Sequence, residues 1–129
     1  MYKRQLRARS KQETLTTTQD IKANQAGTEF NIATDAKIMT LPTITAENLG
    51  MELTFRNTGA DGNNIITLSP ASTDAIHGAV AAVNSGGVNN KDWINTKATA
   101  NKGDFVIIKA VALTEWYITG GVGIWASQA

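Results

Sequence analysis

The chain has 129 residues, of which 42% are hydrophobic and 18% are charged, and it contains no cysteine. This length fits one domain with one modest core, and the lack of cysteine excludes disulfides and cysteine-based zinc or redox sites. No apolar run approaches the roughly 18 residues of a transmembrane helix, and no apolar segment follows the basic start, so we expect neither a membrane span nor a secretory signal.

The charge is unevenly distributed. The first eleven residues contain no acid and five basic residues: Lys3, Arg4, Arg7, Arg9 and Lys11. The rest of the chain keeps seven of the twelve basic residues and all eleven acids, so it carries −4. Because no apolar period is sustained before residue 28, we predict an extended basic N-terminal arm over residues 1–27 and a β-domain over residues 28–129.

Three roles are open to the basic side chains of this arm. They can dock on an acidic protein surface, stay solvated, or bind nucleic acid through phosphate groups. Docking is favoured and nucleic acid is disfavoured, because the body of the chain is acidic and Tyr2 is the one aromatic residue near the basic residues.

Short apolar runs alternate with turn residues from residue 28 onward. They predict strands at 28–32, 37–41, 51–56, 64–69, 104–112, 115–119 and 122–126. Met51, Leu53 and Phe55 alternate with polar residues, which is the period of a strand with one buried face. The Gly- and Asn-rich loop after this strand is expected to close a hairpin with the strand that follows it.

Residues 75–100 are ambiguous, since 79–83 fits a helix or a strand and 84–90 is a loop on either reading. Seven or eight short strands without a long amphipathic helix predict an all-β fold, an antiparallel β-sandwich or barrel that is jelly-roll-like. We expect Phe55, Ile66, Ile107 and Trp116 to point into its core. That core is small for the number of strands, which favours oligomerisation.

Catalytic and metal-binding patterns are weak. His77 is the single histidine, and Asp74 precedes it by three residues, but no nucleophile elbow accompanies them. One histidine is too few for a zinc site, and Ile65 occupies a ligand position in the only calcium-like loop, 61–64. We therefore predict no enzyme, no catalytic residue, no metal and no cofactor.

The chain has three tryptophans, which is a large number for so small a core: Trp93, Trp116 and Trp125. They can fill the core, or they can anchor an interface, where aromatic side chains are favoured. Trp125 lies four residues from the end of the sequence and beside glycines, and it is our candidate for an intersubunit contact.

Several short motifs follow one another in a familiar order. Ile38-Met39-Thr40-Leu41-Pro42 precedes Gly50-Met51-Glu52-Leu53-Thr54-Phe55-Arg56-Asn57, and Asp74-Ala75-Ile76-His77-Gly78 and Glu115-Trp116-Tyr117 come later. This order resembles β-domains of phage head decoration proteins and of some tail-fibre modules, over roughly residues 36–126. The resemblance implies assembly, often as trimers, and it carries over no catalytic residue.

These observations lead to one favoured hypothesis and one alternative. The favoured one is a viral structural protein, a phage capsid decoration (cement) protein in the virion. It would bind the major capsid protein on the outer shell as a homo-oligomer, expected to be a trimer, and stabilise that shell without contacting a membrane. The alternative is a tail-fibre or receptor-binding β-module that recognises host-surface glycans.

Overall fold

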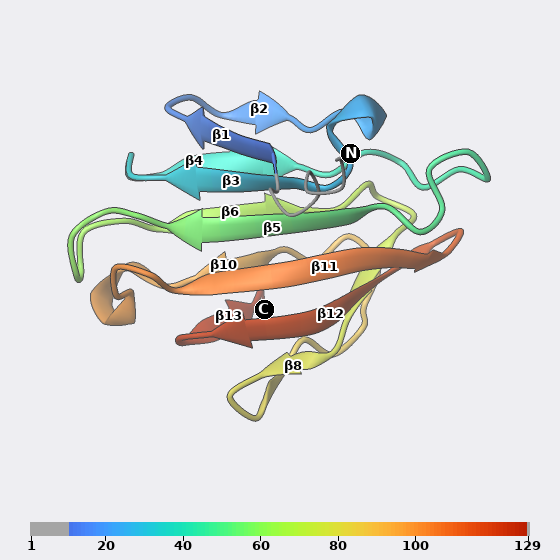
Figure 1. Ribbon diagram of the computed structural model, residues 1–129. Coiled ribbons are helices and arrows are strands. Elements are labelled where there is room, and N and C mark those ends of the chain that lie inside the picture. Colours follow the sequence, from blue (N-terminus) through green and yellow to red (C-terminus); the bar gives the residue numbers. More distant parts are fainter. Residues whose placement is uncertain (1–10, 129) are drawn as a thin grey trace, which may run out of the picture.

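The computed structural model describes residues 11–128, and in it two β-sheets pack face to face (Figure 1). The first sheet contains, in spatial order, β1 (Lys11–Leu15), β3 (Thr28–Ile32), β5 (Glu52–Asn57), β11 (Phe105–Ala112), β12 (Glu115–Val122) and β7 (Ala75–His77). The second contains β13 (Trp125–Ser127), β10 (Trp93–Asn95), β6 (Ile66–Ser69), β4 (Lys37–Thr40) and β2 (Gln19–Asp20). The predicted all-β sandwich is confirmed.

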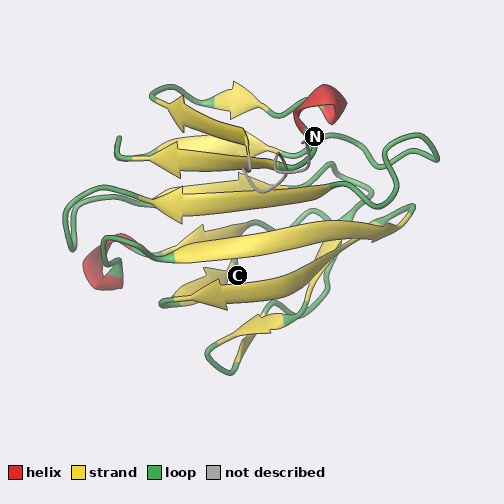
Figure 2. Cartoon of the chain, in the orientation of Figure 1, coloured by secondary structure: helices red, strands yellow, loops and turns green. Residues whose placement is uncertain are grey.

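The remaining elements are small. β8 (Ala79–Val80) and β9 (Val83–Asn84) form a separate hairpin. Two single 3-10 turns, η2 (Ala23–Gln25) and η3 (Lys97–Thr99), are the helical segments drawn in red in Figure 2. Neither of these described helices is long or apolar enough to cross a membrane.

The N-terminal half winds in coils. β1, β3 and β5 lie side by side in the first sheet and β2, β4 and β6 in the second, and all pairings among them are parallel. Each loop therefore carries the chain to the opposite sheet, and each coil adds one strand to both sheets. In this arrangement equivalent side chains stack from coil to coil, as Phe30 does on Phe55 at a ring-centroid distance of 5.2 Å.

The C-terminal half closes the sandwich with antiparallel strands. β11 pairs with β5 and β12 with β11, while β10 pairs with β6 and β13 with β10. The antiparallel direction that the sequence predicts therefore holds for these four pairings, whereas the coiled half is parallel and β7 at the edge of the first sheet pairs in parallel with β12. The predicted hairpin after β5 is wrong, because β5 and β6 lie in different sheets and their connection crosses the end of the sandwich.

The core lies between the two sheets and follows the period-two pattern. Leu53 and Phe55 in β5, and Val106, Ile108 and Ala110 in β11, have no exposed surface. Burying each large side chain of this kind contributes about 1.5–3 kcal/mol. The prediction of an inward Ile107 is wrong. Because Val106 and Ile108 face the core, Ile107 lies on the outer side, opposite Thr54 and Gly120.

The prediction that the extended arm runs to residue 27 is wrong for residues 11–27. Residues 11–27 form β1, β2 and η2, and Leu15 and Ile21 from this stretch belong to the core. The stretch looks polar because β1 and β2 are edge strands that contribute few side chains to the core. Residues 1–10 lie outside the described residues.

A buried polar network holds the crossing loop at the end of β5. The Asn57 side chain donates to Asn95 Oδ1 (2.9 Å) and accepts from the Gly59 N–H (2.9 Å) and from Asn64 Nδ2 (3.3 Å). Asn57, Asn64 and Asn95 are fully buried. Gly59 is required here, because a Cβ on it would lie 2.1 Å from Asn64 Nδ2.

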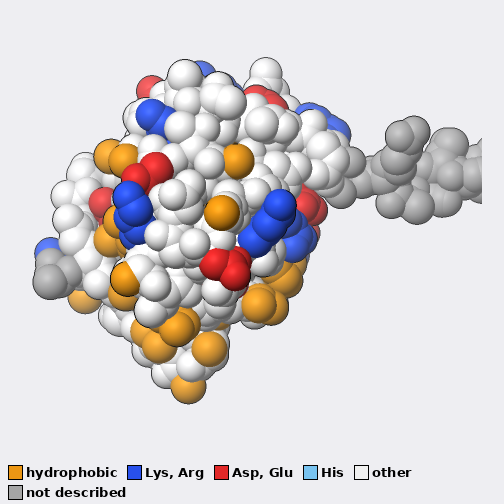
Figure 3. All heavy atoms as spheres, turned by 90° about the vertical axis from the view of Figure 1, so that its left-hand side faces the viewer, with side chains coloured by type: hydrophobic (Ala, Val, Ile, Leu, Met, Phe, Trp, Pro, Cys, Tyr) orange, Lys and Arg blue, Asp and Glu red, His pale blue; other side chains and the backbone are white. Residues whose placement is uncertain are grey.

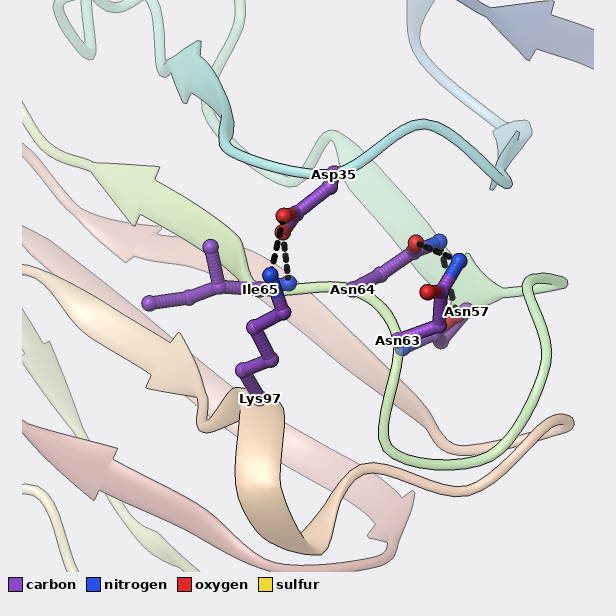
Figure 4. A network of polar contacts seen from close by, with 6 residues as sticks. All are labelled: Asp35, Asn57, Asn63, Asn64, Ile65 and Lys97. Carbon is purple, nitrogen blue, oxygen red and sulfur yellow. Dashed lines mark hydrogen bonds and ion pairs between the residues drawn. The ribbon is translucent and has the colours of Figure 1, made fainter.

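A second set of contacts fixes the same loop to its neighbours (Figure 4). Asp35 accepts a hydrogen bond from the Ile65 N–H (2.9 Å) and pairs with Lys97 Nζ (2.5 Å). The hydrogen bond from Lys97, followed by that from the Ile65 N–H, lowers the pKa of Asp35 below its ordinary value of 3.8. The loop is thus held by a buried amide network on one side and an exposed ion pair on the other.

Candidate functional site

His77 has the neighbours of a structural side chain. Its Nε2 lies 3.7 Å from Glu115 Oε2, and its ring stacks on Tyr117 at 5.3 Å. Tyr117 Oη donates to Glu115 Oε1 (3.0 Å), and this hydrogen bond raises the pKa of Tyr117. Asp74 is buried and accepts from Thr73 Oγ1 (3.2 Å) rather than from His77.

The residues described by the structure contain no group of three His, Asp or Glu side chains placed to hold a metal ion. The site that the structure does offer is a set of exposed surfaces on the β-sandwich. Four are described below: an apolar sheet face, an apolar hairpin end, a hollow near the start of the described chain, and an open sheet edge.

The outer side of β11 and β12 carries several apolar side chains and, between Ile107 and Val111, the exposed Lys109. We call it the outer apolar face and define it by five side chains: Phe105, Ile107, Val111, Tyr117 and Val122. The pairing of Phe105 with Val122 places these two on one side of the sheet. Val111, Tyr117 and Val122 are 49%, 38% and 53% exposed. A half-buried strand normally carries polar residues on its solvent side, so this face differs from an ordinary exposed sheet.

Charged side chains limit the outer apolar face on the side of β5. Arg56 lies over the Phe105 ring, 4.6 Å from its centroid, and its Nε is 2.8 Å from Glu29 Oε2. Glu52, also on β5, is opposite Lys109. The sheet thus carries apolar side chains that are bordered by charges on β5 and interrupted by Lys109, and a mixture of apolar and charged groups of this kind is found at protein interfaces.

The β8–β9 hairpin continues the apolar surface at the end of the sandwich. Its turn residues, Ala81 and Ala82, are exposed and have φ of 51° and 70°. Val83 and Ile124 are 39% and 49% exposed. Figure 3 shows hydrophobic side chains gathered in the lower part of this end of the molecule. We call Ala81, Ala82, Val83 and Ile124 the hairpin end.

The hairpin sits close to β12 because of one glycine. A Cβ on Gly121 would lie 2.8 Å from Val80 Cγ2 and 2.9 Å from the Phe105 carbonyl oxygen. The strand bearing Val122 and the hairpin bearing Val83 therefore form one continuous end of the molecule.

A hollow of about 300 Å³ lies between η2 and the turn that precedes β5. Its lining mixes apolar and polar side chains, including one carboxylate, and consists of Ala23, Ala26, Thr45, Glu47, Asn48, Leu49 and Met51. Asn48 fixes the turn, since its Oδ1 accepts from the Thr45 N–H (2.6 Å) and its Nδ2 donates to the Thr43 carbonyl (3.0 Å). Glu47 is exposed and has no hydrogen bond or ion pair with any described residue.

The first coil leaves one side of β1 without a described neighbour strand. Such an edge can pair with another extended segment unless it is protected. Here it carries the charged side chains of Lys11 and Glu13. Lys11 Nζ donates to the Asn24 carbonyl (3.4 Å), and Glu13 Oε1 accepts from Gln25 Nε2 (3.1 Å). These contacts place the start of the described chain beside η2 and the hollow.

Two groups of residues were predicted as contacts from the sequence. Of the arm residues, Lys11 is exposed at the start of β1, whereas Lys3, Arg4, Arg7 and Arg9 lie outside the described residues. Trp125 is 1% exposed, stacks on Trp93 at 6.2 Å and donates from Nε1 to the Val122 carbonyl (3.1 Å). The core of its own chain therefore accounts for Trp125 without an intersubunit contact.

The outer apolar face was not among the contacts predicted from the sequence, although the sequence carries a signal for it. Phe105, Val106, Ile107 and Ile108 are consecutive, and a strand with one solvated face would alternate. An unbroken apolar run indicates that both faces of the strand are apolar. No protein-family model matches this chain, and no curated protein matches it either. The resemblance to phage structural β-domains stays a prediction.

Proposed function

We propose that this chain is a structural protein of a virus particle, a phage capsid decoration protein that binds the outside of the shell as a homo-oligomer and stabilises it. The observation that carries the proposal is the outer apolar face together with the adjoining hairpin end. Soluble monomers rarely expose large continuous apolar areas, and such areas mark sites of protein association. The chemistry offered by the described surface is adhesion.

The proposed mechanism is burial of apolar surface at many repeated sites on the shell. Each copy needs about 800 Å² of buried surface for a specific interface. The apolar centre supplies the free energy of binding, and the rim formed by Arg56, Glu29 and Glu52 supplies orientation. The basic residues Lys3, Arg4, Arg7, Arg9 and Lys11 add attraction to an acidic capsid or subunit surface. The trimeric state remains part of the proposal and follows from the sequence resemblance.

The test uses one charge placed on the outer apolar face. Val122→Asp is compared with Ile38→Asp, since Ile38 is similarly exposed (43%) but lies on β4 in the other sheet. Co-sedimentation with shells that lack decoration measures binding, and light scattering measures the oligomeric state. We expect Val122→Asp to weaken shell binding or self-association at least about tenfold, as for the loss of a central contact. Equal binding by both variants and the unchanged chain would exclude this face as the interface.

The alternative, a fibre module that binds host glycans, is favoured by one cluster. Tyr117 exposes an aromatic ring beside His77 and Glu115, and sugars bind to an aromatic face flanked by polar groups. Trp93, Trp116 and Trp125 are buried, so none of them adds to such a surface. Binding of the chain to host-surface glycans that is lost in Tyr117→Ala, with shell binding absent, would favour this alternative.

A further inference from the structure

We propose that the tip of the β8–β9 hairpin, Ala81 and Ala82, docks in the hollow between η2 and the turn before β5 of a second copy of this chain. The contact is head to tail, so each copy offers its tip to one neighbour and its hollow to another. The proposal rests on the proposed function, since the contact supplies the self-association of the homo-oligomer and leaves the outer apolar face for the shell.

The tip is strained and apolar, although it is an exposed turn. Ala81 and Ala82 are exposed and have φ of 51° and 70°, in the left-handed region that an alanine side chain disfavours. A two-residue hairpin turn with positive φ prefers Asn-Gly, which is polar and adopts this conformation readily. Backbone strain is concentrated at functional sites. Two methyl groups held at the end of a strained hairpin therefore indicate a binding element.

The hollow is suited to receive this tip. Its apolar lining residues are Ala23, Ala26, Leu49 and Met51. Its volume of about 300 Å³ is at the lower end of the range for small-molecule pockets. The side chains of the tip are single methyl groups, so the turn can enter a hollow of this size, whereas the larger Val80 and Val83 at its base mark the depth at which it stops.

The polar groups of the two surfaces are complementary as well. The N–H groups of Ala81 and Ala82 donate no hydrogen bond to any residue among 11–128. Glu47 in the lining of the hollow is exposed and likewise has no partner in that range. A hydrogen bond from a backbone N–H to a carboxylate is charge-assisted and stronger than a neutral one. Docking therefore gives Glu47 of one copy the free N–H groups of its neighbour's tip.

The tip and the hollow of one chain lie too far apart to meet. Val80, at the base of the tip, lies against Gly121, which is opposite Val106 on β11. The turn that forms the hollow joins β11 four residues further on, where the Gly50 N–H donates to the Ala110 carbonyl (2.7 Å). Four strand residues span about 13 Å. Figure 1 shows the same separation, with η2 as the blue coil at the top and β8 at the bottom.

The contact therefore forms between copies and joins two different surfaces. Such a head-to-tail contact occupies every tip and every hollow only when the chains close into a ring. A ring of this kind places the same sheet face of each copy in an equivalent position, so the outer apolar faces can all bind one shell.

Disulfide trapping between chains that each carry one cysteine tests the contact, because the chain has no cysteine of its own. Ala82→Cys chains are mixed with tagged Leu49→Cys chains or, as a matched control, with tagged Ile38→Cys chains. Leu49 and Ile38 are 47% and 43% exposed, but Ile38 lies on β4 and does not line the hollow. We expect the mixed product with Leu49→Cys to form about tenfold faster than that with Ile38→Cys. Equal rates, or faster linkage of two Ala82→Cys chains to each other, would overturn the proposal.

A charge change tests the same contact in solution by light scattering. Asp tolerates positive φ, so Ala82→Asp retains the turn while it brings a second carboxylate to Glu47, and urea unfolding checks that this variant is folded. We expect Ala82→Asp to weaken self-association about tenfold, as for the loss of a central contact, and the added Glu47→Lys to restore it. Unaltered association of Ala82→Asp, no restoration by Glu47→Lys, or a parent chain that is monomeric at every concentration would each overturn the proposal.

Co-sedimentation with shells separates this contact from the proposed function. Trapping of Ala82→Cys with Leu49→Cys in a chain that ignores shells would support the contact and contradict the decoration role. Shell binding that Val122→Asp weakens, in a chain whose cysteine variants show no preference for the hollow, would support that role and overturn the contact.

Discussion

Replacing Asn57 by alanine should destabilise the sandwich severely, although it changes one polar side chain. Asn57 is fully buried at the end of β5, and its side chain donates to Asn95 Oδ1 and accepts from the Gly59 N–H and Asn64 Nδ2. Asn64 and Asn95 are themselves fully buried, so water cannot replace the lost bonds without entering the core.

The magnitude follows from the groups left without partners. Each buried polar group that loses its hydrogen bond costs about 1–3 kcal/mol. Asn57→Ala takes the hydrogen-bond partner from three groups, the Gly59 N–H, Asn64 Nδ2 and Asn95 Oδ1, while Asn95 Nδ2 still donates to Asp104 Oδ2 and to the Ile124 carbonyl. We therefore expect a loss of about 3–5 kcal/mol in the free energy of unfolding, out of roughly 5–15 kcal/mol for a whole domain.

Urea unfolding followed by tryptophan fluorescence measures this loss, since Trp93, Trp116 and Trp125 are all buried. The matched control is Asn63→Ala. Asn63 is exposed and makes one long contact to Asn64 (3.4 Å), so its replacement should change stability by at most about 0.5 kcal/mol. A change below about 1 kcal/mol for Asn57→Ala would refute the claim that this network holds the crossing loop.

Three other expected outcomes concern the core, the hairpin and acid stability. Phe55→Ala should cost about 3–5 kcal/mol, because it removes the stacked partner of a fully buried ring, and thermal unfolding measures the loss. Replacing Ala81-Ala82 by Asn-Gly should stabilise the chain by about 0.5–1.5 kcal/mol, since both alanines have positive φ and this two-residue turn prefers Asn-Gly; unchanged or lower stability would contradict that reading of the turn. The pKa of Asp35 is lowered in the folded chain. Its pairing with Lys97 therefore stabilises the fold at pH values above 3.8, the ordinary pKa of the carboxyl, and this stabilisation is lost as the pH falls through the folded pKa. Asp35→Asn should therefore remove part of the pH dependence of unfolding in the acid range, and an unchanged acid profile would show that the pair contributes nothing.

The sequence predicts the strands well and their connections poorly. Period-two alternation locates β5, and dense β-branched residues locate β11, because both signals come from neighbours in the chain. The sheet that each strand joins depends on whether a loop turns back or crosses. The loop after Asn57 has the composition of a hairpin turn, yet it carries the chain to the other sheet, and buried amide side chains hold it there. No local pattern distinguishes those outcomes.

The candidate site is predicted only in part for the same reason. β1 reads as a polar arm because it is an edge strand whose main contribution to the core is Leu15. The basic residues stand out in the sequence, whereas the outer apolar face needs the pairing of β11 with β12 to bring Phe105 beside Val122. The hollow joins η2 to a turn about 20 residues further along the chain, so only the folded chain reveals it.

We propose that this chain coats a phage shell through its outer apolar face, and quantitative co-sedimentation of the full chain with shells that lack decoration tests this proposal most directly. The account predicts saturable binding, at a copy number set by the symmetry of the shell, that Val122→Asp weakens and Ile38→Asp leaves unchanged. Absence of binding at concentrations far above the micromolar range, with the chain folded, would contradict it.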